Sequence, residues 1–365
     1  MSDTAPPTAA TPPDIPIVTW ADPQRQAAFG RWLESITGPH GLAVATLRPA
    51  SADASFRRYL RIDCAGGGSR IIMDAPPDKE DCRPFVKVAG LMAAAGLHVP
   101  GILAWDEPQG FMLLDDVGRQ TLMDVIDRGN ASANQALYLR AVDALVAWQK
   151  ASQPTVLPVY DQALLSRELQ LFPDWYLARH RGVTVQGTIR ETLDAQFRLI
   201  TERNLASPSV YVHRDFMPRN LMMPLQDEPR LAVLDFQDAV YGPITYDIAS
   251  LMRDAFLSWD EEFVLDITVR YWQQALRVGL PVDPDFGEFW RSVEWMGLQR
   301  HLKVAGIFAR LTLRDGKPKY LADTPRFIAY IRATAARYRE LTPLLRLVDQ
   351  VEGTGAATGY AFGRV

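Results

Sequence analysis

Two carboxylates and one amide, set at fixed spacings, are the side chains of this sequence best suited to chemistry. In the segment 210–223, VYVHRDFMPRNLMM, Asp215 is followed five positions later by Asn220, and Asp235 lies fifteen residues further on in LAVLDFQD. One carboxylate can hold a hydroxyl group and accept its proton. The other carboxylate and the amide offer the oxygen ligands that Mg²⁺ prefers. Such a set suits phosphoryl transfer, which depends mainly on positioning and charge stabilisation.

The spacing matches the kinase catalytic loop, H-x-D-x-x-x-x-N, followed by a D-F-x metal loop. We therefore predict that Asp215 is the catalytic residue and that Asn220 and Asp235 are metal ligands. His213 is interpreted as a hydrogen-bonding residue of the loop rather than a general base. Asp247 precedes a predicted helix, so it is either a helix N-cap or a carboxylate that holds the catalytic-loop backbone.

Strand signals dominate the chain before Gly118. A helical pattern over 24–36 is followed by two β-rich runs around Gly66-Gly67-Gly68, a turn signal that predicts a hairpin. A second helix pattern and two more short strands complete this part. The expected elements are strands at 56–62, 70–74, 102–105 and 111–114, and helices at 24–36 and 83–95. The pattern predicts an antiparallel sheet with helix packed on it, an α+β layer.

Amphipathic helical patterns dominate after Gly118. They cover 137–150, 164–181, 189–205, 246–257, 263–278 and 289–311. The two segments with the predicted catalytic residues, 210–223 and 231–238, read as short strands between these helices. We predict four regions in the chain. They are a disordered tail at 1–19, a nucleotide-binding N-lobe at 20–117, a helical C-lobe with the catalytic and acceptor sites at 118–350, and a flexible tail at 351–365.

Composition excludes several classes of protein. The 365 residues are 48% hydrophobic and 22% charged, as in globular chains, and the net charge of −4 argues against a nucleic-acid binder. No window of 18 uncharged apolar residues predicts a membrane span. Cys64 and Cys82 show no metal-ligand spacing. We expect a cytoplasmic protein, a monomer or weak homo-oligomer, that acts on a small molecule.

Over most of its length the sequence resembles a known family. The motifs HRDFMPRN, LDFQDA and GPITYD resemble the aminoglycoside phosphotransferase and choline kinase branch of the protein-kinase-like superfamily. Blocks such as SADASFRRYLRI, ELQLFPDWYL and RHLKVAGIFARL are similar to the bacterial anomeric amino-sugar kinases of that branch, roughly over 20–348. The resemblance implies a bilobal α+β fold with an antiparallel-sheet N-lobe and a mostly helical C-lobe. It also implies transfer from ATP, with Mg²⁺, to the C1 hydroxyl of N-acetylmuramate and N-acetylglucosamine, in peptidoglycan recycling toward UDP-sugars.

The nucleotide-binding residues depart from the superfamily pattern. Asp74 ends the strand that normally carries a phosphate-binding lysine, and no GxGxxG is present. The candidates for the missing cation are Arg57, Arg58, Lys79 and Lys87. Ser51 and Ser55, in a turn of small residues, are expected to approach the phosphates. The resemblance implies that adenine binds near Leu114 and Asp116, and it leaves Met217 where a histidine is usual.

The acceptor site is predicted from residue chemistry alone. Trp175 offers an aromatic face, and Arg300, His301 and Lys303 form a cationic cluster in a helical pattern. A cation there suits the lactyl carboxylate of N-acetylmuramate. Two alternatives stay open. One is a kinase for another hydroxyl acceptor, such as an aminoglycoside or a choline-like alcohol. The other is a nucleotide-binding pseudokinase, suggested by the missing lysine but opposed by the intact Asp215, Asn220 and Asp235.

Overall fold

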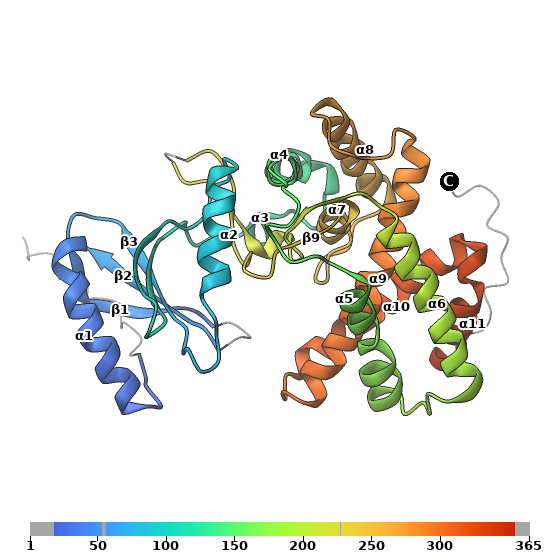
Figure 1. The fold of residues 1–365 in the computed structure, drawn as a ribbon, viewed down its shortest axis with the longest axis horizontal. Coiled ribbons are helices and arrows are strands. Elements are labelled where there is room, and N and C mark those ends of the chain that lie inside the picture. The colour runs from blue at the N-terminus through green and yellow to red at the C-terminus, as the bar shows by residue number, and fades with distance from the viewer. Residues whose placement is uncertain (1–17, 53–55, 227, 355–365) are drawn as a thin grey trace, which may run out of the picture. The chain divides into compact units, whose positions relative to one another are not determined.

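The computed structural model describes residues 18–52, 56–226 and 228–354, with only the backbone of residues 51 and 52 (Figure 1). The chain divides into two compact units. The first combines Met1–Gly90 with Val99–Gly118, and the second combines Leu91–His98 with Arg119–Val365. Helix α2 (Arg83–Ala94) contains the point at which the first unit gives way to the second. The domain ranges predicted from the sequence stay a prediction.

The first unit is built on a five-stranded antiparallel sheet with the order β1-β2-β3-β5-β4. Its strands are β1 (Leu42–Ala52), β2 (Arg58–Cys64), β3 (Ser69–Asp74), β4 (Ile102–Asp106) and β5 (Phe111–Asp115). The β2–β3 turn contains Gly67 and Gly68, whose φ angles of 91° and 75° favour glycine. β3 and β5 pair with each other at the centre of the sheet, and Ile72, Met73, Phe111, Met112 and Leu113 on them are fully buried. The predicted antiparallel sheet is confirmed.

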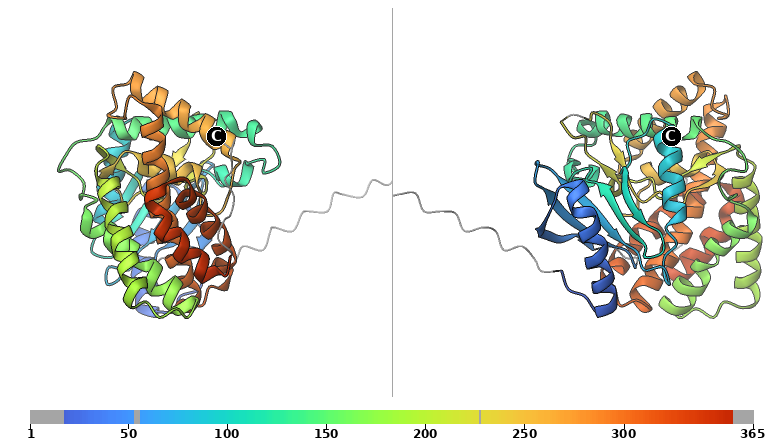
Figure 2. Two further views of the ribbon diagram at one scale, coloured as in Figure 1. Left: turned by 90° about the vertical axis from the view of Figure 1, so that its right-hand side faces the viewer. Right: turned by 60° about the vertical axis from the view of Figure 1, so that its left-hand side comes forward.

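Helix α1 (Pro23–His40) packs on this sheet, as the right-hand view of Figure 2 shows. The Asp22 carboxylate caps its start, and Gly41, with a φ of 58°, ends it. One face buries an apolar cluster against the sheet: Phe29, Trp32, Leu33 and Ile36 pack with Leu60, Ile62, Ile72, Phe111 and Leu113. The helical pattern over 24–36 predicted this helix, which runs further, to His40, because the left-handed residue that ends it is Gly41.

Helices form most of the second unit (Figure 1). They are α3 (Leu122–Val125), α4 (Gln135–Lys150), α5 (Gln162–Leu169), α6 (Gly187–Leu205), α7 (Thr245–Met252), α8 (Glu261–Arg277), α9 (Phe286–Leu313), α10 (Thr324–Arg337) and α11 (Thr342–Glu352). The sequence analysis did not predict α10 and α11. Both begin with Thr-Pro, and proline is well suited to the first turn of a helix.

The single helix predicted over 164–181 is two helices in the structure. α5 ends at Leu169, and a π-helix, Phe172–His180, follows with Pro173 in its first turn. Helix α9 approaches the junction closely at Gly306, where a Cβ atom would lie 2.4 Å from the carbonyl carbon of Leu171. Only glycine leaves room for that approach, which brings the preceding turn of α9 close to the last turn of α5.

Two short antiparallel sheets hold the catalytic segments in the second unit. β6 (Ser209–Val212) pairs with β9 (Val240–Pro243), and β7 (Leu221–Met222) pairs with β8 (Ala232–Val233). The loops between these strands carry the residues whose spacing predicted the chemistry. Over the described ranges, no helix is both long and apolar enough to cross a membrane.

Candidate active site

His213 bridges the catalytic loop and the segment that leads to Asp235. Its Nδ1 atom accepts a hydrogen bond from the Asp215 backbone N–H at 3.2 Å. Its Nε2 atom therefore carries the proton, which it donates to the Leu234 carbonyl oxygen at 3.0 Å. Burial lowers the pKa of His213, so the ring is neutral at pH 7. Both ring nitrogens are engaged, as expected for a hydrogen-bonding rather than a proton-accepting histidine.

Asp247 holds the backbone of the same loop. Its side chain is fully buried, and its two oxygens accept hydrogen bonds from the backbone N–H groups of His213 at 2.7 Å and Arg214 at 3.0 Å. The N-cap of α7 is Ile244, so Asp247 lies in the first turn of the helix and is not its N-cap. Of the two alternatives for Asp247, the structure thus supports the one in which its carboxylate orders the catalytic loop.

The structure brings Asp215, Asn220 and Asp235 together. The Asn220 Nδ2 atom lies 2.8 Å from the Asp215 carbonyl oxygen and 3.3 Å from Asp235 Oδ2. Gln237 Nε2 donates to the other Asp235 oxygen at 2.8 Å. Asp235 has a φ of 63°, and this left-handed backbone is costly for a residue other than glycine. Strain of this kind is typical of residues held in place for function.

The donor set at Asn220 and Asp235 fits Mg²⁺. The Asp235 side chain is exposed, and the Asn220 amide turns its nitrogen toward Asp235, which leaves its oxygen for another partner. Among the described residues, no group of three or more His, Cys, Asp or Glu side chains could hold a metal by itself. One carboxylate and one amide are nonetheless enough for Mg²⁺, which keeps water ligands and also binds substrate phosphates.

Arg300 and Lys303, predicted as acceptor contacts, both reach the catalytic-loop region from α9. Arg300 Nη1 donates to the Arg214 carbonyl oxygen at 2.8 Å. Lys303 Nζ lies 2.9 Å from a Glu168 oxygen and 3.1 Å from the Tyr246 hydroxyl. Both side chains are buried. Their charges are thus engaged inside the second unit, and an acceptor role for them stays a prediction.

His301 and Trp175 do not join this cluster. His301 stacks on Tyr330 with ring centroids 4.6 Å apart, and Trp175 packs on a hydrophobic core with Arg179 4.1 Å from its ring. His301 lies on nearly the opposite face of α9 from Lys303, which meets Glu168, because two helix positions correspond to a rotation of about 200°. As acceptor contacts, both residues stay predictions.

Asp74, which replaces the usual lysine, is neutralised within the first unit. It is 1% exposed, and its carboxylate meets Arg25 and Arg58 at 2.6 Å each. Arg58 also donates to the Thr19 carbonyl oxygen at 2.8 Å and covers the Trp20 ring. The guanidinium of Arg58 is therefore already engaged by protein groups.

The other cation candidates differ in exposure. Arg57 is buried and forms an ion pair with Glu80 at 3.2 Å. Lys79 is exposed and lies 5.0 Å from the centre of the Phe56 ring. Lys87 is exposed on α2. All three stay predicted phosphate contacts.

Of the remaining predicted nucleotide contacts, Ser51 lies in β1, Leu114 in β5 and Asp116 directly after β5. The Asp116 carboxylate accepts from Arg61 at 2.6 Å and from Ser69 at 2.5 Å, so it holds the chain after β5. Leu114 has a buried side chain and can offer only its backbone. Ser55 lies outside the described residues, and Ser51 is described only by its backbone in β1.

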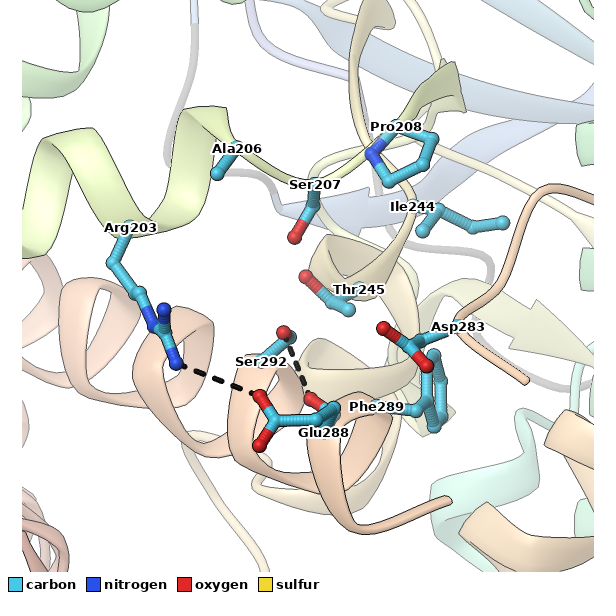
Figure 3. Close-up of a pocket in the computed structure, with 10 residues that line it drawn as sticks. All are labelled: Arg203, Ala206, Ser207, Pro208, Ile244, Thr245, Asp283, Glu288, Phe289 and Ser292. Carbon is cyan, nitrogen blue, oxygen red and sulfur yellow. Dashed lines mark hydrogen bonds and ion pairs between the residues drawn. The ribbon is translucent and has the colours of Figure 1, made fainter. Parts of the chain in front are cut away.

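A separate pocket of about 180 Å³ lies in the second unit (Figure 3). Its lining includes Arg203 and Glu288, whose side chains form an ion pair at 3.6 Å, and Ser292, which donates to the Glu288 carbonyl oxygen at 3.0 Å. None of the residues that line it is a predicted site residue. The pocket therefore does not carry the chemistry predicted from the sequence.

Sequence reasoning missed Glu168, which is central to the cluster that contains Lys303. Its side chain also forms an ion pair with Arg214 at 2.7 Å and a short hydrogen bond with the Tyr160 hydroxyl. A signal was present, because Glu168 lies beside Leu165 and Leu169 on the apolar face of the predicted helix. A charged residue on such a face is rarely buried without a partner.

Comparison with known proteins identifies the family of the chain. The model of the phosphotransferase enzyme family matches residues 46–282. An N-acetylmuramate/N-acetylglucosamine kinase of Pseudomonas aeruginosa is 55% identical over 83% of this chain and 88% of its own length. A kinase of the same name from Pseudomonas putida is 47% identical over 93% of this chain and 97% of its own.

Solved structures of low sequence identity share the fold. A choline/ethanolamine kinase family protein from Mesorhizobium loti matches with a TM-score of 0.59 at 15% identity, covering 89% of this chain and 99% of that one. An amicoumacin kinase, solved with AMP-PNP and Ca²⁺, matches with a TM-score of 0.53 at 16% identity, covering 84% and 95%. The protein-kinase-like α+β fold is thus confirmed. The chain belongs to the phosphotransferase enzyme family and, within it, groups with the N-acetylmuramate/N-acetylglucosamine kinases.

Proposed function

We propose that this phosphotransferase moves the γ-phosphoryl group of ATP to the anomeric hydroxyl of N-acetylmuramate and N-acetylglucosamine. The products are the α-1-phosphates, which serve cell-wall recycling toward UDP-N-acetylmuramate and UDP-N-acetylglucosamine. The observation that carries the proposal is the high identity to kinases of that name over most of both chains. The juxtaposition of Asp215, Asn220 and Asp235 supports it, because a chain without catalytic activity has no need of all three.

The proposed mechanism assigns one task to each of these residues. The Asp215 carboxylate holds the C1 hydroxyl and takes its proton as the oxygen bonds to the γ-phosphorus. The bond from that phosphorus to the bridging oxygen breaks, and ADP leaves. The Asn220 hydrogen bond to the Asp215 carbonyl oxygen keeps the loop in register with Asp235. When Mg²⁺ is held by Asp235 and Asn220, it neutralises charge on the phosphates.

An acceptor screen tests the proposal. ATP consumption is measured with N-acetylmuramate, N-acetylglucosamine, kanamycin, choline and no acceptor, and the sugar products are examined by ³¹P NMR. We expect turnover with both amino sugars and a phosphate coupled to the anomeric proton. Turnover only with kanamycin or choline would contradict the proposed acceptor. ATP binding without turnover on any acceptor would instead favour a pseudokinase.

A further inference from the structure

We propose that Glu168 is a positioning residue that acts through Arg214 to hold Asp215 in place for phosphoryl transfer. This inference rests on the proposed function, because it assigns a role in the same reaction. Glu168 lies at the end of α5, distant in sequence from the catalytic loop, and its carboxylate meets Tyr160, Arg214 and Lys303. The argument starts from the unusual backbone of Arg214.

Arg214, which directly precedes Asp215, has a φ of 78°. A residue with a side chain pays on the order of 1–3 kcal/mol for this conformation, whereas glycine adopts it readily. An arginine at such a position calls for an interaction that glycine could not make. That interaction is the ion pair between Arg214 Nη2 and Glu168 Oε1 at 2.7 Å.

Both ends of Arg214 are anchored. Its backbone N–H donates to Asp247 at 3.0 Å, and its carbonyl oxygen accepts from Arg300 at 2.8 Å. Its guanidinium meets Glu168 and also reaches the Asp238 carbonyl oxygen at 3.4 Å. One side chain therefore links α5, the catalytic loop and the loop that carries Asp235.

The charge on Glu168 is well supported. Burial alone would raise the pKa of this carboxyl, but the positive charges of Lys303 and Arg214 outweigh burial and the pKa lies below its ordinary value. The Tyr160 hydroxyl donates a short hydrogen bond to the second carboxylate oxygen. Glu168 is thus an ionised group whose remaining exposure is only 5%, and it offers Arg214 a fixed, charged partner.

The close approach of α9 explains how Lys303 joins the pair. Gly306 lets α9 touch the backbone of Leu171. Lys303 lies about one turn before Gly306 on α9, and Glu168 lies about one turn before Leu171, so the two side chains are brought together. Lys303 Nζ consequently reaches Glu168 at 2.9 Å. It balances the carboxylate but does not touch the catalytic loop through that contact.

The first test removes the charge of Glu168 with little change of shape. In purified Glu168→Gln we expect kcat to fall about 10- to 100-fold, the usual effect of losing a group that orients an active-site residue. The KM for ATP and for N-acetylmuramate should change little, because Glu168 is buried and is proposed to act through Arg214 rather than on a substrate. The matched control is Glu340→Gln, which breaks the ion pair of the half-exposed Glu340 with Arg291 and should leave kcat unchanged.

A double variant separates positioning from charge balance. Glu168→Gln combined with Lys303→Met removes one negative and one positive charge, so the cluster regains its net charge. If Glu168 mattered only by balancing the charge of Lys303, kcat would return to the wild-type value in the double variant. The positioning role predicts that kcat stays low, because Arg214 still lacks an ionised partner.

Arg214→Gly keeps the test decisive if the Glu168 variants do not fold. Glycine suits the φ of 78°, and Glu168 keeps Lys303 and Tyr160, so this variant should fold. We expect the same 10- to 100-fold fall in kcat. A kcat within twofold of wild type in folded Arg214→Gly or folded Glu168→Gln would overturn the inference. A wild-type enzyme that is inactive on amino sugars would instead refute the proposed function, and the two failures are therefore distinct.

Discussion

Asp74 in the first unit and Glu168 in the second each form a buried cluster of ion pairs. Each is a buried carboxylate that meets two cationic side chains within 3 Å. An ion pair taken out of water contributes little net stability, but breaking one leaves an uncompensated buried charge. The two carboxylates should therefore be equally intolerant of substitution, yet for different reasons.

The difference lies in what the cations hold at their other end. Around Asp74, Arg25 comes from α1 and Arg58 from β2, so the cluster ties a helix to its sheet. Around Glu168, one cation is Arg214, whose backbone leads into Asp215. The comparison teaches that the role of a buried ion pair follows from the segment it immobilises, not from its own geometry.

The largest expected effect is on the stability of the first unit. Asp74→Asn should lower the free energy of unfolding by about 3 kcal/mol, because it leaves the charges of Arg25 and Arg58 without a carboxylate. Below the melting temperature its kcat should equal that of wild type. Thermal melts and steady-state kinetics check both points. A variant with unchanged Tm and reduced kcat would place Asp74 in the chemistry and remove the contrast with Glu168.

Lys303→Met should lower kcat/KM by roughly tenfold, and equally for N-acetylmuramate and N-acetylglucosamine. The reason is that Lys303 Nζ is engaged by Glu168 and Tyr246. If Lys303 instead recognised the lactyl carboxylate, only N-acetylmuramate would show the loss, as a raised KM. Measuring kcat and KM with both sugars distinguishes these outcomes and shows whether Lys303 of the Glu168 cluster also binds the acceptor.

The last expected effect is a dependence of the stability of the second unit on pH. Burial lowers the pKa of His213 and of His301, so the folded protein binds their protons less readily than the unfolded chain does. Their contribution is present above the unfolded pKa of about 6.5 and is lost as pH falls below it, by up to about 1.4 kcal/mol per pH unit for each group. Burial raises the pKa of the Asp254 carboxyl to about 6, so its protonation below that pH stabilises the folded state and offsets part of the loss. Hydrogen exchange at pH 7.5 and 5.5 should show weaker protection around α9 and β6 and little change in the β1–β5 sheet. Equal loss in both units would contradict this assignment.

The sequence was informative wherever function depends on a short segment. The offsets of Asp215, Asn220 and Asp235 follow from one loop–strand–loop unit, and the structure brings the three together. The strands of the first unit were predictable because alternation and turn glycines are local signals. Helices α10 and α11 were missed although each starts with a Thr-Pro signal.

Long-range packing was the part that the sequence could not supply. The partners of Asp74 include Arg25, 49 residues away, and Glu168 meets Arg214 across 46 residues. No local periodicity of the sequence predicts either ion pair. The role of Gly306 could not be predicted either, because it depends on the backbone of Leu171, which packs against it in the fold. Cationic side chains on α9 could be predicted as functional, but their partners could not.

The turnover of Asp215→Asn with N-acetylmuramate, measured by ATP consumption, tests the central claim of this account most directly. Asparagine keeps the shape of the side chain but cannot accept the C1 hydroxyl proton, and the backbone bonds to His213 and Asn220 remain available. We expect kcat to fall by about 10²- to 10⁴-fold with an unchanged Tm, the range for loss of a general base. A folded Asp215→Asn variant that phosphorylates the sugar at a rate near that of wild type would contradict it.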